Sequence, residues 1–171
     1  MKKIIAQPGS KKDVADFLEK VVINAGVGRL SSQPGFEEKA LPQVVGDISL
    51  ICGQKPHTRQ AKKSIAGFKV REGQIVGLRA TLRGKRMVDF FERMIKIVLP
   101  RVKDFRGLNI SSVDGGGALN IGVREQYVFP EIVPERSLVA FSLEISFIPR
   151  VRRREEAIKR YGELGVPLKK Q

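Results

Sequence analysis

The sequence predicts an α+β fold in which helices pack on one face of an antiparallel β-sheet and an extended basic β-hairpin projects from it. Residues 74–82 alternate between apolar and polar side chains, as in a strand buried on one face. Residues 87–99 instead repeat apolar side chains every three or four positions, as in a helix. We expect one domain, residues 14–171, preceded by a flexible basic tail over residues 1–13.

The first third of the chain contains signals for a strand and a helix. Residues 13–20 have apolar side chains at helical spacing over a short stretch, and residues 21–23 form a β-branched run typical of a buried strand. Apolar residues then recur at helical spacing up to Cys52, and Gly53 fits a C-terminal stop. Pro42 disfavours a helix interior, so we expect the well-formed helix to begin there.

The middle of the chain predicts a hairpin over residues 64–82. Its expected strands are residues 64–70 and 74–82, because the connection between them is short and contains a glycine. Alternation in the second strand places one set of side chains on the core and the other on an open face left for a partner. The core set is Val76, Leu78, Ala80 and Leu82, and the open set is Ile75, Gly77, Arg79, Thr81 and Arg83.

The last third is expected to contain a glycine-rich loop, two strands and a basic end. The loop is residues 111–118, and the strands are residues 119–129 and 137–148. A proline directly follows each expected strand and ends it. Residues 150–171 hold an arginine cluster, a short helix and a basic tail.

The charge distribution points to a polyanionic partner. The chain carries a formal charge of +14, and residues 53–86 alone hold ten lysines and arginines against one acid, Glu72, a net +9. Apolar residues interrupt this stretch at strand spacing, so we expect it to be folded rather than a disordered tail. A folded, strongly cationic surface is the expected footprint of nucleic-acid binding.

Other features of the sequence indicate the cellular compartment of the protein. No apolar run approaches the roughly 20 residues needed to span a bilayer. The N-terminal apolar run is too short for a secretory signal. The single cysteine, Cys52, cannot form an internal disulfide and is expected to be a small core residue. We therefore expect a cytoplasmic protein with no membrane partner.

The sequence gives little indication of a catalytic site. One histidine, His57, and one cysteine cannot supply a Cys/His zinc site. Asp114 precedes three glycines but follows no phosphate-binding pattern, so a nucleotide-handling enzyme is a distant third hypothesis. No set of nucleophile, base and orienting group can be assembled. We predict no catalytic residue, no metal and no cofactor.

Several segments resemble, in order, the bacterial-type large-subunit ribosomal protein L5 family, which binds 5S ribosomal RNA. They are VVINAGVG, GQKP, AKKSIAGFK, REG, IVGLRATLRG, LPRVKDFRGLN, ALNIGVREQ, FPEI and LGVPLKK. The resemblance is close over residues 19–131 and looser towards the C-terminus. It implies an α+β protein in the central protuberance of the large subunit.

The resemblance also implies particular contacts. Asn24, Gln54 and Thr81 match positions that contact 5S RNA in the family. Lys62, Lys63, Arg79 and Arg83 are our additional candidates for binding its phosphates. The hairpin tip would reach the P-site tRNA and a small-subunit head protein across an intersubunit bridge, with Lys69 and Arg71 facing phosphate. The tip is Gly67, Phe68, Lys69, Val70, Arg71, Glu72 and Gly73. Phe68 could stack on a base or pack within the hairpin.

Further implied partners are 23S-type rRNA and neighbouring 5S-binding ribosomal proteins. The chain departs from the family pattern at four places: a short lead before residue 21, a segment between Asn24 and Gln54 that is a few residues longer than usual, three glycines at residues 115–117 where the family usually has glycine–arginine–glycine, and extra arginines at 150 and 152–154. These arginines could compensate electrostatically. The alternative function is a non-ribosomal basic interaction module that binds an acidic protein partner.

Overall fold

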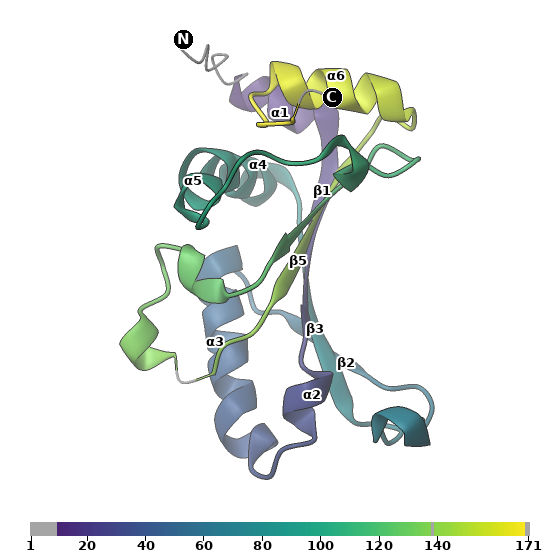
Figure 1. Cartoon of the computed structure of the whole chain (residues 1–171), viewed down its shortest axis with the longest axis vertical. Helices are drawn as coiled ribbons and strands as arrows, with labels where there is room; N and C mark the ends of the chain where they lie inside the picture. Colours follow the sequence, from purple (N-terminus) through teal and green to yellow (C-terminus); the bar gives the residue numbers. More distant parts are fainter. Residues whose placement is uncertain (1–9, 138, 170–171) are drawn as a thin grey trace. The chain divides into compact units, whose positions relative to one another are not determined.

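The computed structural model describes residues 10–137 and 139–169 and confirms the α+β fold. Five strands form one sheet in the order β2-β3-β1-β5-β4 (Figure 1). They are β1 (Leu18–Gly26), β2 (His57–Gln60), β3 (Ile75–Leu82), β4 (Leu119–Val123) and β5 (Leu143–Pro149). The helices are α1 (Lys11–Phe17), α2 (Gly28–Ser31), α3 (Leu41–Cys52), α4 (Gly84–Arg93), α5 (Leu99–Arg101) and α6 (Arg154–Glu163).

The described residues form two compact units. Unit 1 comprises residues 10–22, 82–121 and 146–169, and unit 2 comprises residues 23–81, 122–137 and 139–145. Strands β1, β4 and β5 therefore each contribute residues to both units, as does β3 through its last residue, Leu82.

Aromatic side chains fill the core of unit 1. Phe17 of α1 meets Tyr161 of α6 edge-to-face at 5.0 Å between ring centroids, so these two helices lie side by side (Figure 1). Phe91 of α4 meets Phe147 of β5 in the same geometry at 5.3 Å. The Tyr161 hydroxyl donates a hydrogen bond to the Phe147 carbonyl at 2.9 Å, and burial raises the pKa of this phenol.

The start and the long helix of unit 1 differ from expectation. Residues 1–9 of the expected tail lie outside the described residues, whereas Lys11–Asp13 begin α1 because the Ser10 and Asp13 side chains cap it reciprocally. The apolar stripe of residues 87–99 is buried as expected. The helical path begins earlier, at Gly84, and a π-helical turn over Met94–Val98 carries it past Pro100 to Arg101.

Helix α3 supplies the core of unit 2. Val44, Ile48 and Ile51 are buried on one side of it, together with Cys52. Gly53 ends the helix in the left-handed conformation, φ 67°, that glycine favours, and this confirms the expected stop. Proline stands in the first turn, also as expected.

The expected hairpin strand over residues 64–70 is wrong. The strand that pairs antiparallel with β3 is β2, with His57 opposite Arg79. Residues 61–74 form a loop instead, in which a 3₁₀ turn at Ala66–Phe68 and a left-handed Lys69, φ 53°, reverse the chain. The apolar side chains that suggested a strand have no layer to pack on, since Ile65 is 50% and Phe68 77% exposed.

The two later strands are shorter than expected, and side chains that bond the backbone in their place explain both differences. Gln43 donates to the Val139 carbonyl and accepts from the Val139 N–H, each at 3.2 Å. Gln126 is fully buried, and its amide donates to the Val139 carbonyl at 2.8 Å and accepts from the Phe141 N–H at 3.0 Å. These side chains thus satisfy backbone groups that a sheet ladder would use. Strand β4 ends at Val123 and β5 begins only at Leu143.

Candidate nucleic-acid interface

The open side of β3 is present as the sequence predicted. Leu78, Ala80 and Leu82 are buried as predicted, and the alternate side chains of this strand are half-buried. Val76, which was also predicted to face the core, is only half-buried. Arg79 and Thr81 therefore share the side of β3 that faces away from the core of unit 2. The two residues are separated by about 7 Å along the strand, because a strand rises roughly 3.3 Å per residue.

Asn24 lies on the same side, on the neighbouring strand β1. It alternates with the buried Ile23 and Ala25. The Val27 N–H donates to the Val76 carbonyl at 3.0 Å, and counting back along the antiparallel strands from this bond places Asn24 level with Arg79. Since His57 of β2 is opposite Arg79, three polar side chains form a row across three strands.

Gln54 and Thr81 are brought together by a direct contact. The Gln54 side-chain amide donates a hydrogen bond to the Thr81 carbonyl at 3.1 Å. Gly53 makes this possible, because its left-handed conformation ends α3 and turns the chain immediately before Gln54. Among the described residues, the Thr81 hydroxyl makes no hydrogen bond. The structure therefore groups Asn24, Gln54 and Thr81 within unit 2.

The cations predicted to bind 5S RNA lie in different parts of the structure. The Arg79 side chain is half-buried, and its Nε–H is buried with no hydrogen-bond partner within the described part of the chain. Lys62 and Lys63 are exposed in the loop of residues 61–74. Arg83 is exposed but belongs to unit 1, directly before α4.

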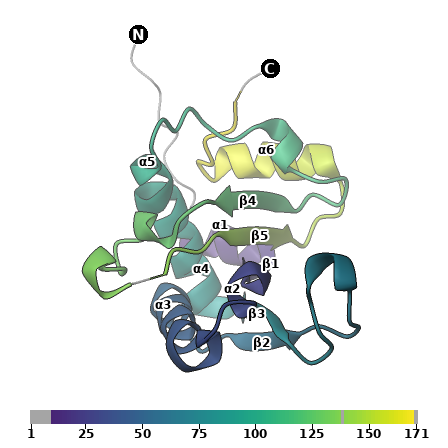
Figure 2. The ribbon, with the colours of Figure 1, turned by 60° about the horizontal axis from the view of Figure 1, so that its bottom comes forward.

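The loop of residues 61–74 extends from the ends of β2 and β3 and contains the whole predicted tip (Figure 2). Its base is closed by two hydrogen bonds, from the Ala61 N–H to the Gln74 carbonyl at 2.9 Å and from the Gly73 N–H to the Ala61 carbonyl at 3.0 Å. Ile65 and Val70 exchange two further bonds across it. The backbone is thus folded rather than extended, and it displays Lys69 and Arg71 to solvent.

Sequence reasoning missed the side chain that holds this loop. The Gln74 side-chain oxygen accepts from the Arg71 N–H at 2.9 Å, and its amide donates to the Ser31 hydroxyl at 2.8 Å. The Ser31 hydroxyl in turn donates to the Gly28 carbonyl at 2.9 Å. This relay ties the loop to helix α2. No local pattern in the sequence indicated it, because Ser31 and Gln74 are far apart along the chain.

Phe68 does not pack within the loop. Its 77% exposure excludes the packing interpretation that the sequence left open. The aromatic ring is therefore available to a partner, between cations on either side of it in the chain.

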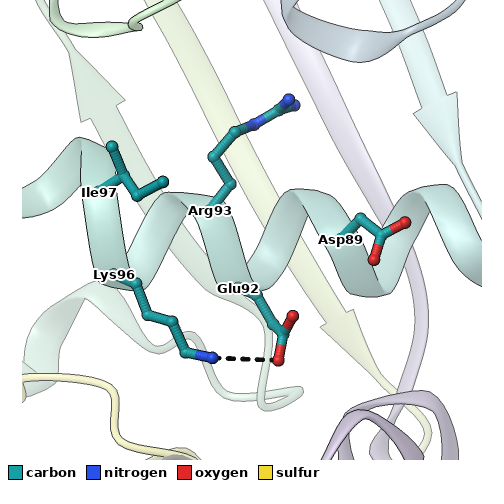
Figure 3. A pocket seen from close by; sticks show the side chains of 5 residues that line it. All are labelled: Asp89, Glu92, Arg93, Lys96 and Ile97. Atoms are coloured by element: carbon teal, nitrogen blue, oxygen red, sulfur yellow. Dashed lines mark hydrogen bonds and ion pairs between the residues drawn. The ribbon is translucent and has the colours of Figure 1, made fainter.

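Other surfaces of the described residues are less suited to binding a ligand. Asp89, Glu92 and Arg93 of α4, with Lys96 and Ile97 of the π-helical turn that follows it, line a shallow hollow of about 230 Å³. Lys96 forms an ion pair with Glu92 (Figure 3). This volume is below the range usual for small-molecule sites. Within the described ranges, no group of three or more His, Cys, Asp or Glu side chains could hold a metal ion. No described helix is long and apolar enough to cross a membrane.

Known proteins resemble this chain over most of its length. A family model for the C-terminus of the ribosomal L5 family matches residues 75–168, and one described as ribosomal protein L5 matches residues 17–71. The large ribosomal subunit protein uL5 of Chlorobium luteolum is 45% identical over 154 residues, which cover 90% of this chain and 77% of that protein. The protein of the same name from Syntrophomonas wolfei is 43% identical over 152 residues, 89% of this chain and 83% of that protein.

Proposed function

The chain belongs to the ribosomal protein L5 family, and we propose that it is a structural constituent of the large ribosomal subunit that binds 5S ribosomal RNA in the central protuberance. One observation carries the assignment of the surface. Asn24, Arg79 and Thr81 occupy half-buried positions on the open side of β1 and β3, and the Gln54 amide donates to the Thr81 carbonyl next to them. Side-chain amides, hydroxyls and arginines are the groups that contact RNA sugars, base edges and phosphates.

Charge supports a phosphate-rich partner on this surface. The basic stretch of residues 53–86 has a net charge of +9 and includes both β2 and β3. Lys62, Lys63 and Arg83 extend the set of cations beyond Arg79, and 23S-type rRNA is the second nucleic acid that we assign to the protein. Neutralised phosphates release their counterions, which favours binding at low salt.

The tip of the loop, residues 67–73, is assigned a separate partner. It carries two cations and one acid and is exposed almost throughout. We assign it to the P-site tRNA and to a small-subunit head protein across an intersubunit bridge. Lys69 and Arg71 provide the charge, and the exposed Phe68 ring can stack on a base.

Sedimentation of a cell lysate separates this proposal from a basic module that binds an acidic protein. We expect the tagged chain to sediment with large ribosomal subunits, together with 5S RNA and neighbouring 5S-binding ribosomal proteins. It should be released only by high salt, as expected for contacts to phosphate. Sedimentation as a free protein, or with a protein partner that contains no RNA, would contradict the proposal.

A further inference from the structure

A second group of cations lies in unit 1, between β5 and α6. Arg150, Arg152 and Arg153 are all exposed, and we call them the arginine segment. Glu19 accepts from Lys20 at 3.1 Å and from Arg152 at 3.1 Å. Residues 150–156 contain four arginines and two acids, Glu155 and Glu156, so this stretch keeps a formal charge of 4 − 2 = +2.

The backbone under the arginine segment is fixed. The Arg150 N–H donates to the Phe17 carbonyl at 2.8 Å. The next arginine, Arg154, folds back onto the protein, where its Nε donates to the Val113 carbonyl at 3.0 Å and its guanidinium to the Ile110 carbonyl at 3.1 Å. The cations are therefore presented from an ordered base, which lowers the entropic cost of using them for binding.

Gly115, Gly116 and Gly117, which we call the glycine turn, lie beside the ordered backbone of the arginine segment. A Cβ on Gly117 would come within 2.9 Å of the Ala157 Cβ, and Gly117 has a φ of +85°, so only glycine fits there. Gly115 and Gly116 are exposed, and their N–H groups make no hydrogen bond within the described residues. One oxygen of the exposed Asp114 carboxylate accepts from the Ala118 N–H at 2.8 Å. Two free backbone donors thus add to the three arginines.

The chemistry of this surface fits RNA phosphate better than a protein. The large apolar side chains exposed in the described structure are Leu50, Ile65, Phe68, Ile97 and Val133, none of them in the arginine segment or the glycine turn. Protein interfaces usually have an apolar core, whereas arginine forks and backbone N–H groups match phosphate oxygens. Glu155 and Glu156 follow in the first turn of α6, where the helix dipole favours acids.

We propose that Arg150, Arg152 and Arg153, with the Gly115–Gly116 turn, form a second contact surface for an RNA backbone. This inference rests on the proposed function, because it assigns ribosomal RNA as the source of the phosphates. It adds a surface in unit 1 to the one formed by β1 and β3 in unit 2.

The test uses the full chain and a mixed-sequence RNA duplex as the probe, with affinity measured over a range of salt concentrations. Replacing the three arginines by glutamine should flatten the slope of log affinity against log salt by about two to three, since each phosphate contact contributes roughly 0.9. The matched control is Lys39→Gln, Lys103→Gln and Lys159→Gln, which removes the same charge from exposed positions outside both surfaces. It should flatten the slope by less than one.

Two outcomes overturn the inference in different ways. Equal flattening by both triple variants would mean that only net charge matters, so this surface would have no specific role even if 5S binding were intact. A wild-type chain that binds neither the duplex nor 5S RNA would overturn the proposed function together with the inference. Binding of 5S RNA by the wild type, measured in parallel, distinguishes these results.

Discussion

At the scale of single residues, Thr81 contributes to the candidate site through two different groups. Its carbonyl accepts the Gln54 amide and helps to hold the end of α3 against β3. Its hydroxyl has no partner among the described residues and lies on the open side of the strand. The backbone group therefore organises the site, while the side chain remains available to RNA.

Replacing Thr81 by valine separates these two roles, because valine keeps the shape and the backbone carbonyl but removes the hydroxyl. We expect 5S RNA affinity to fall about 3- to 10-fold, the effect of one lost hydrogen bond, with little change in thermal stability. Filter binding and thermal unfolding provide the two measurements. Thr58→Val is the control, since Thr58 is opposite Leu78 and on the other side of the sheet. An equal loss in the control would contradict the assignment.

At the scale of elements, the loop of residues 61–74 depends on two side chains outside its exposed tip, Gln74 and Ser64. The Ser64 hydroxyl accepts from the Glu72 N–H at 2.9 Å. Gln74 connects the Arg71 N–H to Ser31 of α2 through bonds of 2.9 and 2.8 Å. The loop has almost no buried apolar side chains, so these polar contacts and the bonds at its base are what order it.

Gln74→Leu should therefore loosen the loop without unfolding unit 2. We expect the Arg71 amide to exchange its hydrogen about 3- to 10-fold faster, because leucine cannot accept its hydrogen bond. Hydrogen exchange followed by NMR measures this directly. Gln60→Leu is a matched control on β2, where the side chain is exposed and makes no hydrogen bond within the described residues. Unchanged exchange in Gln74→Leu would show that other contacts hold the loop.

Local sequence patterns predicted the elements whose cause is local. The alternation of β3, the apolar stripe that continues from α4 and the glycine stop of α3 are all present. Patterns failed where distant side chains replace backbone pairing. Gln126 ends β4 early by bonding residues 139 and 141, and residues 64–70 do not form a strand because no strand pairs with them.

The candidate site was predictable to a similar degree. Thr81 and Arg79 follow from alternation along one strand, whereas Asn24, Gln54 and Thr81 were grouped by resemblance to a family. The contact between Gln54 and Thr81 requires α3 to end beside β3, which no spacing in the sequence reveals. The Gln74–Ser31 bond likewise depends on the placement of α2.

At the scale of the whole molecule, we divide the basic surface between two partners, 5S RNA and the P-site tRNA. Thr81 and its neighbours are assigned to 5S RNA, and Lys69 and Arg71 to the P-site tRNA. The double variant Lys69→Ala, Arg71→Ala should leave the affinity for isolated 5S RNA within about 2-fold, because exposed loop charges outside the site contribute little. In assembled ribosomes it should weaken P-site tRNA binding about 3- to 10-fold.

Comparison with a charge-matched variant, Lys39→Ala with Lys159→Ala, controls for lost charge alone. Loss of 5S binding in the Lys69 and Arg71 variant, but not in its control, would show that the loop belongs to the 5S surface. The division of the molecule proposed above would then be incorrect.

The central claim is that the open, cationic side of the sheet binds 5S RNA largely through its phosphates. The most direct test measures the affinity of the full chain for 5S RNA as a function of salt concentration. Four candidate cations, Lys62, Lys63, Arg79 and Arg83, predict a slope of log affinity against log salt of about −3 to −4, and the arginine segment steepens it by about a further two to three where it contacts the same RNA. An affinity that does not change with salt, or no binding of 5S RNA at low salt, would contradict the account.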